Sequence, residues 1–332
     1  MRSVTVGGET STTRARWAPR RVARGIRRRA ASALGRTPAP PPTPPPFDRR
    51  GVLLQGVAPE MRILEIGPSY APLAPRSEGW NACVVDHATR EELVEKYRDP
   101  VHGVDVSRIE DVDVVWRNGP LDEALGPERQ GFDVCLASHV IEHTPDLVGF
   151  VGGVLRTLVP GGWLSLAVPD LRYCFDLLRG PTRVGEVVDA HVRHASRHGI
   201  ATFVDQRAYA VRKGGRIAWS AADGGTVELM ESLADVESLL ASRDDDDGEY
   251  VDAHVWRFTP ASFELLVLEL SALGMLDAHV ESIHASVGCE FFVRIRAGSR
   301  LPATVEQIDA IRLALLERSV REVGAVWATV GA

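Results

Sequence analysis

Short apolar runs alternate with helical patterns through the middle of the chain. Runs rich in Val, Ile and Leu predict buried strands at 61–66, 82–86, 112–116, 132–138 and 163–168. Helical patterns lie between them at 90–97 and 146–158, and the second ends before a Pro-Gly-Gly turn. Strands that alternate with helices predict an α/β protein with a parallel sheet and right-handed crossovers.

This regular pattern breaks after residue 170 and returns near residue 259. The stretch between predicts a helix at about 184–196, a Gly-rich hairpin at 209–220 and an acidic loop at 244–247. Thr259 and Pro260 then suit the N-cap and the first position of a helix. Three further elements are expected: strands at 278–282 and 290–295, joined as an antiparallel hairpin, and an amphipathic helix at 305–326.

These patterns divide the chain into five parts. We expect a disordered Arg/Pro-rich tail (1–46), a cofactor-binding core (47–170), an insert that forms a substrate lid (171–258), the final helix and hairpin of the core (259–298) and a C-terminal helix (299–332).

Charge separates the tail from the rest of the chain. Residues 1–50 contain twelve arginines and only two acidic residues, whereas the whole chain carries a net charge of −7. A basic helix at 22–34 could touch an anionic membrane or a partner. We expect no nucleic acid partner, because the tail lacks interleaved aromatic residues and the acidic body would repel phosphates. The terminal helix leaves room for pairing with another chain.

Other features of the sequence argue against a membrane, exported, zinc-binding or redox protein. No apolar run reaches the roughly 18 residues of a membrane span, and no apolar segment follows Arg20-Arg21 as an export signal requires. The four cysteines are far apart, so zinc and redox motifs are not expected. These features favour a cytoplasmic protein.

The turn after the first strand limits the choice of cofactor. It reads Gly67-Pro-Ser-Tyr-Ala-Pro72, so it lacks the later glycines of a dinucleotide fingerprint, and no Gly-Lys-Ser/Thr follows as in a P-loop. Glu65, just before the turn, would repel a pyrophosphate and attract a cation. Asp86, at the end of the next strand, suits a ribose, because a carboxylate has two oxygens for two hydroxyl donors.

At this point the sequence resembles the class I S-adenosylmethionine-dependent methyltransferases. The resemblance rests on four stretches in order: Leu64-Glu-Ile-Gly67, Val85-Asp86, Phe132 to His143 and Leu158 to Pro169. The Glu-Ile-Gly-Pro-Ser turn and Asp252-Ala-His-Val-Trp-Arg-Phe-Thr-Pro260 look like a bacterial subgroup of this family. The resemblance implies a doubly wound, mostly parallel, seven-stranded Rossmann-like sheet with a C-terminal antiparallel hairpin.

The resemblance also implies a cofactor site. S-adenosylmethionine would be held by residues after the first, second, third and fourth strands: Glu65, Gly67, Pro68, Ser69, Asp86, His87, Trp116, Ser138 and His139. Glu65 would order the methionine part by holding its amino group directly or through water. Trp116 would stack on the adenine, and Ser138 and His139 would line the sulfonium side.

Methyl transfer from a sulfonium needs no metal, so we expect none. An oxygen acceptor needs a general base, and the candidates by position are His143, Asp170 and His254, with Tyr173 beside them. Glu142-His143 also suits a structural pair at a helix start or, less well, a metal site. His191, His194 and His198 would share one helical face, which we interpret as a solvated surface rather than a metal face.

The predicted function is therefore methyl transfer to a polar small molecule or glycan at oxygen. A non-catalytic S-adenosylmethionine-binding or scaffold module is the alternative from another class. A nicotinamide-dependent oxidoreductase is disfavoured by the failed glycine fingerprint.

Overall fold

The computed structural model describes residues 47–242, 251–298 and 304–330. The tail predicted at 1–46, with its basic helix, and the acidic loop at 244–247 lie outside the described residues.

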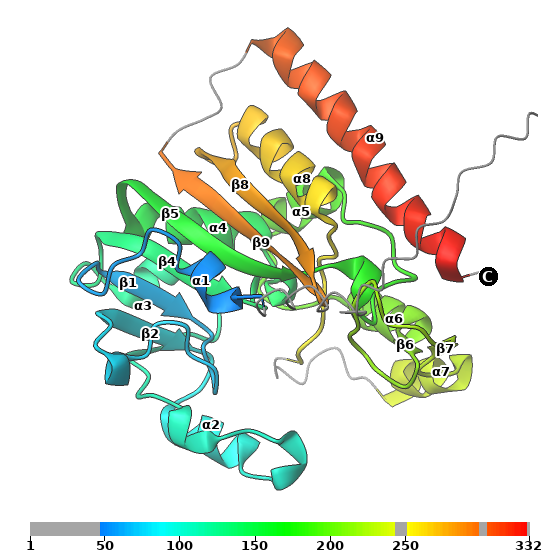
Figure 1. Ribbon diagram of the computed structural model, residues 1–332, viewed down its shortest axis with the longest axis horizontal. Coiled ribbons are helices and arrows are strands. Elements are labelled where there is room, and N and C mark those ends of the chain that lie inside the picture. The colour runs from blue at the N-terminus through cyan, green and yellow to red at the C-terminus, as the bar shows by residue number, and fades with distance from the viewer. Residues whose placement is uncertain (1–46, 243–250, 299–303, 331–332) are drawn as a thin grey trace, which may run out of the picture. The chain divides into compact units, whose positions relative to one another are not determined.

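One seven-stranded sheet forms the centre of the fold (Figure 1). Its order is β3-β2-β1-β4-β5-β9-β8; β3, β2, β1, β4 and β5 pair in parallel, and β9 runs antiparallel to both of its neighbours, β5 and β8. The strands are β1 (Ile63–Ile66), β2 (Ala82–Asp86), β3 (Val114–Val115), β4 (Phe132–Ser138), β5 (Leu158–Pro169), β8 (Ala278–Val287) and β9 (Glu290–Ala297). The predicted fold class is confirmed, with the C-terminal hairpin added at one edge of the parallel strands.

Side chains alternate between the two faces of the sheet, as a period of two requires. Leu64 and Cys135 join a large core under the helices, whereas Ile63 and Val134 join a smaller core on the other face. The large core is covered by α3 (Leu121–Leu125), α4 (Leu147–Thr157), α5 (Val184–Val192) and α8 (Pro260–Ala272). Leu53 of the short helix α1 (Arg49–Leu53) belongs to the smaller core.

Side-chain caps fix where the main helices begin. Thr89 and Glu92 form a reciprocal capping box at the start of α2 (Arg90–Tyr97). Asp146 accepts a hydrogen bond from Gly149 at the start of α4. Thr259 caps α8 and Pro260 takes its first turn, as the sequence predicted.

The stretch expected to form the lid has two structural parts. Its first helix, α5, contacts α4 and α8 and so covers the sheet. The rest forms a small unit with its own core of Leu177, Val211 and Trp219, built from α6 (Ile200–Tyr209), β6 (Val211–Lys213), β7 (Val227–Leu229) and α7 (Leu233–Ser242).

Of two local predictions in this stretch, one is confirmed in part and one is wrong. The Gly-rich piece predicted at 209–220 does turn at Gly214-Gly215, where Lys213 and Arg216 form an antiparallel bridge, but the longer pairing of β6 is with β7 at 227–229. The histidines at 191, 194 and 198 do not share a helical face. The helix ends at Val192, His194 is left-handed (φ 51°), and His198 is buried beyond the helix.

The remaining elements lie at the periphery. The long helix α9 (Val305–Val330) packs along α8 (Figure 1). Short 3-10 turns occur at Arg76–Glu78, Pro100–His102, Val106–Arg108, Ile141–His143 and Leu171–Tyr173. Within the described ranges, the helices are either too short or too polar to cross a membrane.

Candidate functional site

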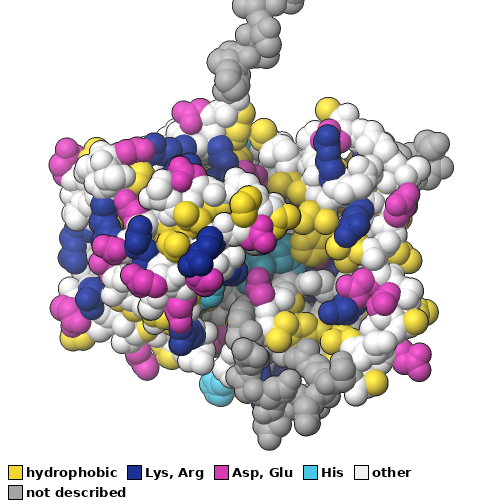
Figure 2. Space-filling view, turned by 90° about the horizontal axis from the view of Figure 1, so that it is seen from below, with side chains coloured by type: hydrophobic (Ala, Val, Ile, Leu, Met, Phe, Trp, Pro, Cys, Tyr) yellow, Lys and Arg dark blue, Asp and Glu magenta, His cyan; other side chains and the backbone are white. Residues whose placement is uncertain are grey.

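The predicted site residues gather where the parallel strands end. β1, β2 and β4 end at Ile66, Asp86 and Ser138, which brings their following loops to one edge of the sheet. Because β9 is antiparallel, its first residue, Glu290, pairs with Pro169 and lies at this same edge. Figure 2 shows histidine side chains in a hollow on one face of the molecule, with acidic and hydrophobic side chains beside them.

Glu65 fixes the path of the first loop. Its side chain is 2% exposed, and its two oxygens accept hydrogen bonds from the backbone N–H groups of Leu73 (2.5 Å) and Ala74 (3.1 Å). Burial raises the pKa of Glu65 to about 7, although those hydrogen bonds act in the opposite direction. This carboxyl holds the loop in the absence of further glycines; a contact with the cofactor stays a prediction.

Position 67 requires glycine for two reasons: its left-handed backbone and the close approach of Val140. Its φ is +64°, and a Cβ there would lie 2.9 Å from Cγ2 of Val140. Ser69 is also left-handed (φ 48°), and its N–H donates to Oδ2 of Asp86 at 3.0 Å. Among the described residues, the buried Oγ of Ser69 finds no hydrogen-bond partner, so it can donate to a bound molecule.

Asp86 is a buried acid held by the ends of two loops. Its Oδ1 accepts from the N–H of His87 at 2.7 Å, and its Oδ2 accepts from Ser69. Oδ2 keeps a second lone pair, so it can still accept from a ribose hydroxyl. The exposed His87 ring also contacts Oδ1 at 2.7 Å.

Trp116 lies just beyond β3. Its ring stacks on Phe150 with centroids 5.9 Å apart, and its N–H donates to the carbonyl of Gly119. Packing against the core therefore occupies part of this ring, and adenine stacking on it remains a prediction.

An ion-pair chain crosses the end of β4. Arg49 donates to Ser138 Oγ at 2.6 Å and to both oxygens of Glu290, at 2.6 and 2.9 Å. Glu290 also contacts His139 Nε2 at 2.9 Å. Burial would lower the pKa of His139, but its contacts with Glu142 and Glu290 outweigh this and raise it to about 9. Burial would raise the pKa of Glu290, but His139 and Arg49 lower it to about 2.

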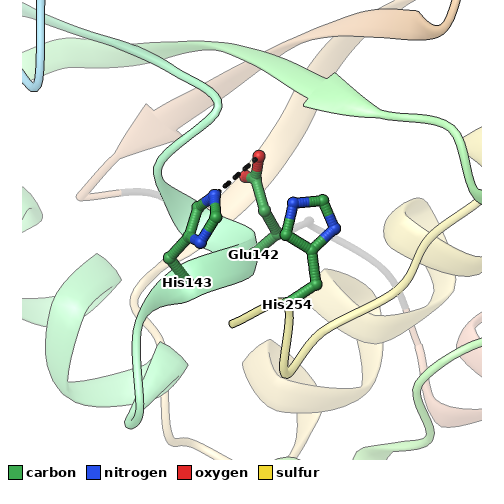
Figure 3. A group of neighbouring side chains, drawn as sticks. All are labelled: Glu142, His143 and His254. Carbon is green, nitrogen blue, oxygen red and sulfur yellow. Dashed lines mark ion pairs between the residues drawn. The ribbon is translucent and has the colours of Figure 1, made fainter. Parts of the chain in front are cut away.

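Two predicted catalytic residues, His143 and His254, meet at Glu142. Their rings pack edge to face with centroids 4.6 Å apart, and Figure 3 shows both beside the Glu142 carboxylate. His143 Nε2 lies 3.7 Å from Glu142 Oε1. The returning insert brings His254 here, because the N–H groups of Val255 and Trp256 donate to the backbone carbonyl of Glu142.

A second acid orients each of these histidines. His143 Nδ1 lies 2.8 Å from Asp252, and His254 Nδ1 lies 2.6 Å from the buried Asp176. Burial would raise the pKa of Asp176, but His254 and Arg179 lower it. Burial would lower the pKa of His143, but the contact with Asp252 raises it. Each ring therefore has its Nδ1 engaged and its Nε2 turned to the other side.

Asp170, the third catalytic candidate, has another arrangement. It is fully buried, and its oxygens accept hydrogen bonds from the backbone and guanidinium of Arg172 and from Ser286 Oγ. It also caps the turn that Tyr173 ends. Through these contacts Asp170 holds the start of the insert in place. Asp170 lies outside the Glu142–His143–His254 cluster.

Sequence reasoning missed the partners that come from distant segments. Arg49 and Glu290 are 241 positions apart, and Asp176 and His254 are 78 apart. No short motif connects such pairs. The only sequence signal was positional: Glu290 begins a strand and Asp176 follows one.

Comparisons with known proteins support one family. Residues 15–213, more than half of the chain, match a family model described as a methyltransferase domain. No curated protein matches the chain.

Similar solved structures are distant. One is a SAM-dependent methyltransferase from Methanosarcina mazei (13% identity, 74% of this chain and 95% of that chain, TM-score 0.36). Another is the CcbJ methyltransferase from Streptomyces caelestis (12%, 75% and 93%, TM-score 0.39). A third, from Rhodobacter sphaeroides, is provisionally described as a Zn-dependent alcohol dehydrogenase (15%, 77% and 90%, TM-score 0.41). Likenesses this distant carry no argument about activity.

Proposed function

The chain belongs to the methyltransferase domain family, and from that premise we propose that it transfers a methyl group to an oxygen of a polar small molecule or glycan. The family match also supports S-adenosylmethionine as the cofactor that the motifs predicted. Assignment to the bacterial subgroup with the Glu-Ile-Gly-Pro-Ser turn remains part of the proposal.

The observation that carries this proposal is the pair of buried acids at the ends of β1 and β2. Asp86 Oδ2 keeps a lone pair for a ribose hydroxyl, and Ser69 Oγ, which has no hydrogen-bond partner among the described residues, lies on the loop beside it. Glu65 adds negative charge below the loop when it is ionised. These residues fit a ribose-bearing cation better than they fit a pyrophosphate.

The acceptor would be bound on the side of His143 and His254. S-adenosylmethionine supplies a methyl group on a sulfonium, which leaves as a neutral thioether. The chain's part is to align the acceptor hydroxyl and to receive its proton. Two imidazoles with Nδ1 held by carboxylates present Nε2 in a fixed direction, which is how a general base is oriented.

The insert supports a polar acceptor. The part that returns to the sheet edge carries His254 and Asp252, and Arg179 beneath it donates to the backbone carbonyl of His254. Such a wall offers hydrogen bonds to hydroxyl groups. Transfer to a purely apolar acceptor would count against this part of the proposal.

Calorimetry with S-adenosylmethionine tests the donor site. We expect Asp86→Asn to bind it about 10–100-fold more weakly, because a hydrogen bond to a charged group contributes roughly 1.5–3 kcal/mol. Asp189→Asn, an exposed acid on α5, is the matched control and should bind as the wild type does. Equal affinity in both variants would remove Asp86 from the site.

A screen of hydroxyl-bearing sugars and glycosides with labelled donor tests the reaction. We expect an O-methyl product, and a loss of turnover in His143→Ala or His254→Ala without loss of donor binding. No donor binding by the wild type would overturn the proposal. Donor binding without turnover on any acceptor would favour the non-catalytic module.

A further inference from the structure

The meeting point of Glu142, His143 and His254 has the composition of a metal site. One potential ligand atom from each residue lies within 4.8 Å of the others (Figure 3). Two imidazoles and one carboxylate are a recurrent ligand set for divalent transition metals, and the set leaves coordination positions open.

Glu142 lacks the hydrogen bonds that a buried carboxylate normally has. Its side chain is completely buried, and within the described part of the chain neither oxygen has a hydrogen-bond partner. The nearest charged atoms are His139 Nδ1 at 3.4 Å and His143 Nε2 at 3.7 Å. Burial without hydrogen bonds disfavours an ionised carboxylate. The His139 ring at 3.4 Å offsets part of this cost when it is protonated, and a bound cation would offset more of it.

The outer contacts match those of metal-binding histidines. A histidine ligand usually gives its other ring nitrogen to a carboxylate, which fixes the ring and makes it a better ligand. His143 does so with Asp252 and His254 does so with Asp176, while Arg179 holds Asp176 at 2.7 Å. In Figure 3 one ring nitrogen of His254 lies on the side of Glu142 and His143.

We propose that Glu142, His143 and His254 bind one divalent transition-metal ion between the end of β4 and the returning insert. The 3.7 Å between His143 Nε2 and Glu142 Oε1 is close to the roughly 3.4 Å between two ligands of a tetrahedral ion with bonds of about 2.0–2.1 Å. The widest separation in the cluster, up to 4.8 Å, must shorten by up to about 1.4 Å to reach this spacing. The ion would link the insert, through His254, to the core, through Glu142 and His143. Backbone hydrogen bonds to Glu142 already hold the insert and the core together at this place.

This proposal revises the expectation that the chain holds no metal. The proposal concerns metal binding and does not require methyl transfer. It also changes the general-base mechanism, because a histidine nitrogen that binds a metal cannot accept a proton. With the ion in place, the acceptor hydroxyl would meet the ion rather than a free imidazole.

Titration of Zn²⁺ into untagged, chelator-treated full-length protein tests the site without methyl donor or acceptor. We expect one ion per chain with micromolar or tighter affinity, and anomalous X-ray scattering at the cluster in crystals grown with Zn²⁺. His143→Ala and Glu142→Gln should lose this binding. His194→Asn is the matched control: it removes an exposed histidine where the left-handed backbone tolerates asparagine, and its affinity should be unchanged.

Asp176→Asn separates a metal site from a merely packed cluster. Removing an outer carboxylate typically weakens metal binding about 10–100-fold, so we expect that loss while the bound Zn²⁺ still scatters at the cluster. Circular dichroism checks that each variant is folded, and His143→Gln replaces His143→Ala if the latter is not.

Two results would overturn the proposal. One is wild-type protein that takes up no stoichiometric Zn²⁺, and the other is folded His143→Ala and Glu142→Gln that bind Zn²⁺ as the wild type does. Either result could occur in a protein that still binds S-adenosylmethionine and transfers its methyl group. The failure of this inference is therefore distinguishable from failure of the proposed function.

Discussion

At the residue scale, two features of Glu65 have opposite effects on its protonation. Its oxygens hold the backbone of Leu73 and Ala74, and ionised carboxylates are the better acceptors. Its burial nevertheless favours the neutral acid and raises the pKa to about 7. A cationic ligand nearby would favour the ionised form, so donor binding and proton release at Glu65 should be coupled.

Glu65→Gln should change how stability depends on pH. Because the folded-state pKa is raised from 4.5 to about 7, the stabilising effect of the neutral acid is fully present below pH 4.5 and is lost as pH rises through 7. The unfolding free energy of the wild type, relative to Glu65→Gln, should fall by roughly 3 kcal/mol across this range. Denaturant titrations of the free protein at pH 4.5, 6 and 7.5 measure it. A constant difference would show that Glu65 does not titrate there.

Gly67→Ala should destabilise the protein. The left-handed backbone costs an alanine about 1–2 kcal/mol, and the contact with Val140 adds to this. Val140→Ala should restore the packing part only. Gly185→Ala, in helix α5 with open space around it, is the control and should be neutral or stabilising. Thermal unfolding compares them, and equal melting temperatures for the two alanine variants would contradict this account.

At the scale of elements, the antiparallel strand β9 decides what faces the end of β4. Its direction places Glu290 beside Pro169, where it meets both Arg49 from α1 and His139 from the loop after β4. The short helix α1 is thereby fixed at the mouth of the site by a bidentate ion pair. The same helix contributes Leu53 to the smaller core, so packing and charge hold it together.

The long helix α9 packs along α8, and its residue Val326 packs against the small core of the insert. Leu315 of α9 is 7% exposed, whereas Leu313 is 60% exposed. Leu315→Ala should cost about 2–3 kcal/mol of unfolding free energy, because it opens a cavity in this packing. Leu313→Ala should change it by less than about 0.5 kcal/mol. Urea denaturation measures both, and a larger cost for Leu313→Ala would indicate that another chain covers its face.

At the scale of the whole molecule, the ends of the parallel strands collect the loops, the insert and the start of β9 into one region. A polar pocket also lies at the opposite edge, lined by Arg62, Asn81, Cys83 and Asp113 among others. The arrangement of Asp86, Ser69 and the histidine cluster favours the first region for ligands, as expected in open α/β sheets. A cytoplasmic location and the roles of the five predicted parts stay predictions.

Hydrogen exchange measured with and without S-adenosylmethionine shows at which edge of the sheet the ligand binds. We expect slower exchange in peptides that cover 67–74, 84–90 and 138–143, because the ligand would hold the loops that Glu65 and Asp86 organise. Peptides from β8 serve as the internal control and should not change. Protection centred instead on residues around 62, 81–83 and 113 would place the ligand in the pocket at the opposite edge.

The sequence by itself determined the alternation of strands and helices, the helix start at Thr259, and the acids at the ends of β1 and β2. These are local properties: apolar periodicity, side chains that cap their own helix, and a turn whose glycine is required where it stands. The turn at Gly214-Gly215 was predicted, but the longer pairing of β6 with 227–229 was not. The histidines after Val192 were mispredicted because the helix ends there and His194 takes a left-handed conformation.

Only the tertiary structure decided which acids meet which bases. Arg49 with Glu290, and His254 with Asp176, join because antiparallel β9 and the returning insert close on the same edge of the sheet. Their attraction is worth little until folding brings the atoms within hydrogen-bond distance and removes water. Sequence order contains no record of that proximity, so the cluster at Glu142 became visible only in three dimensions.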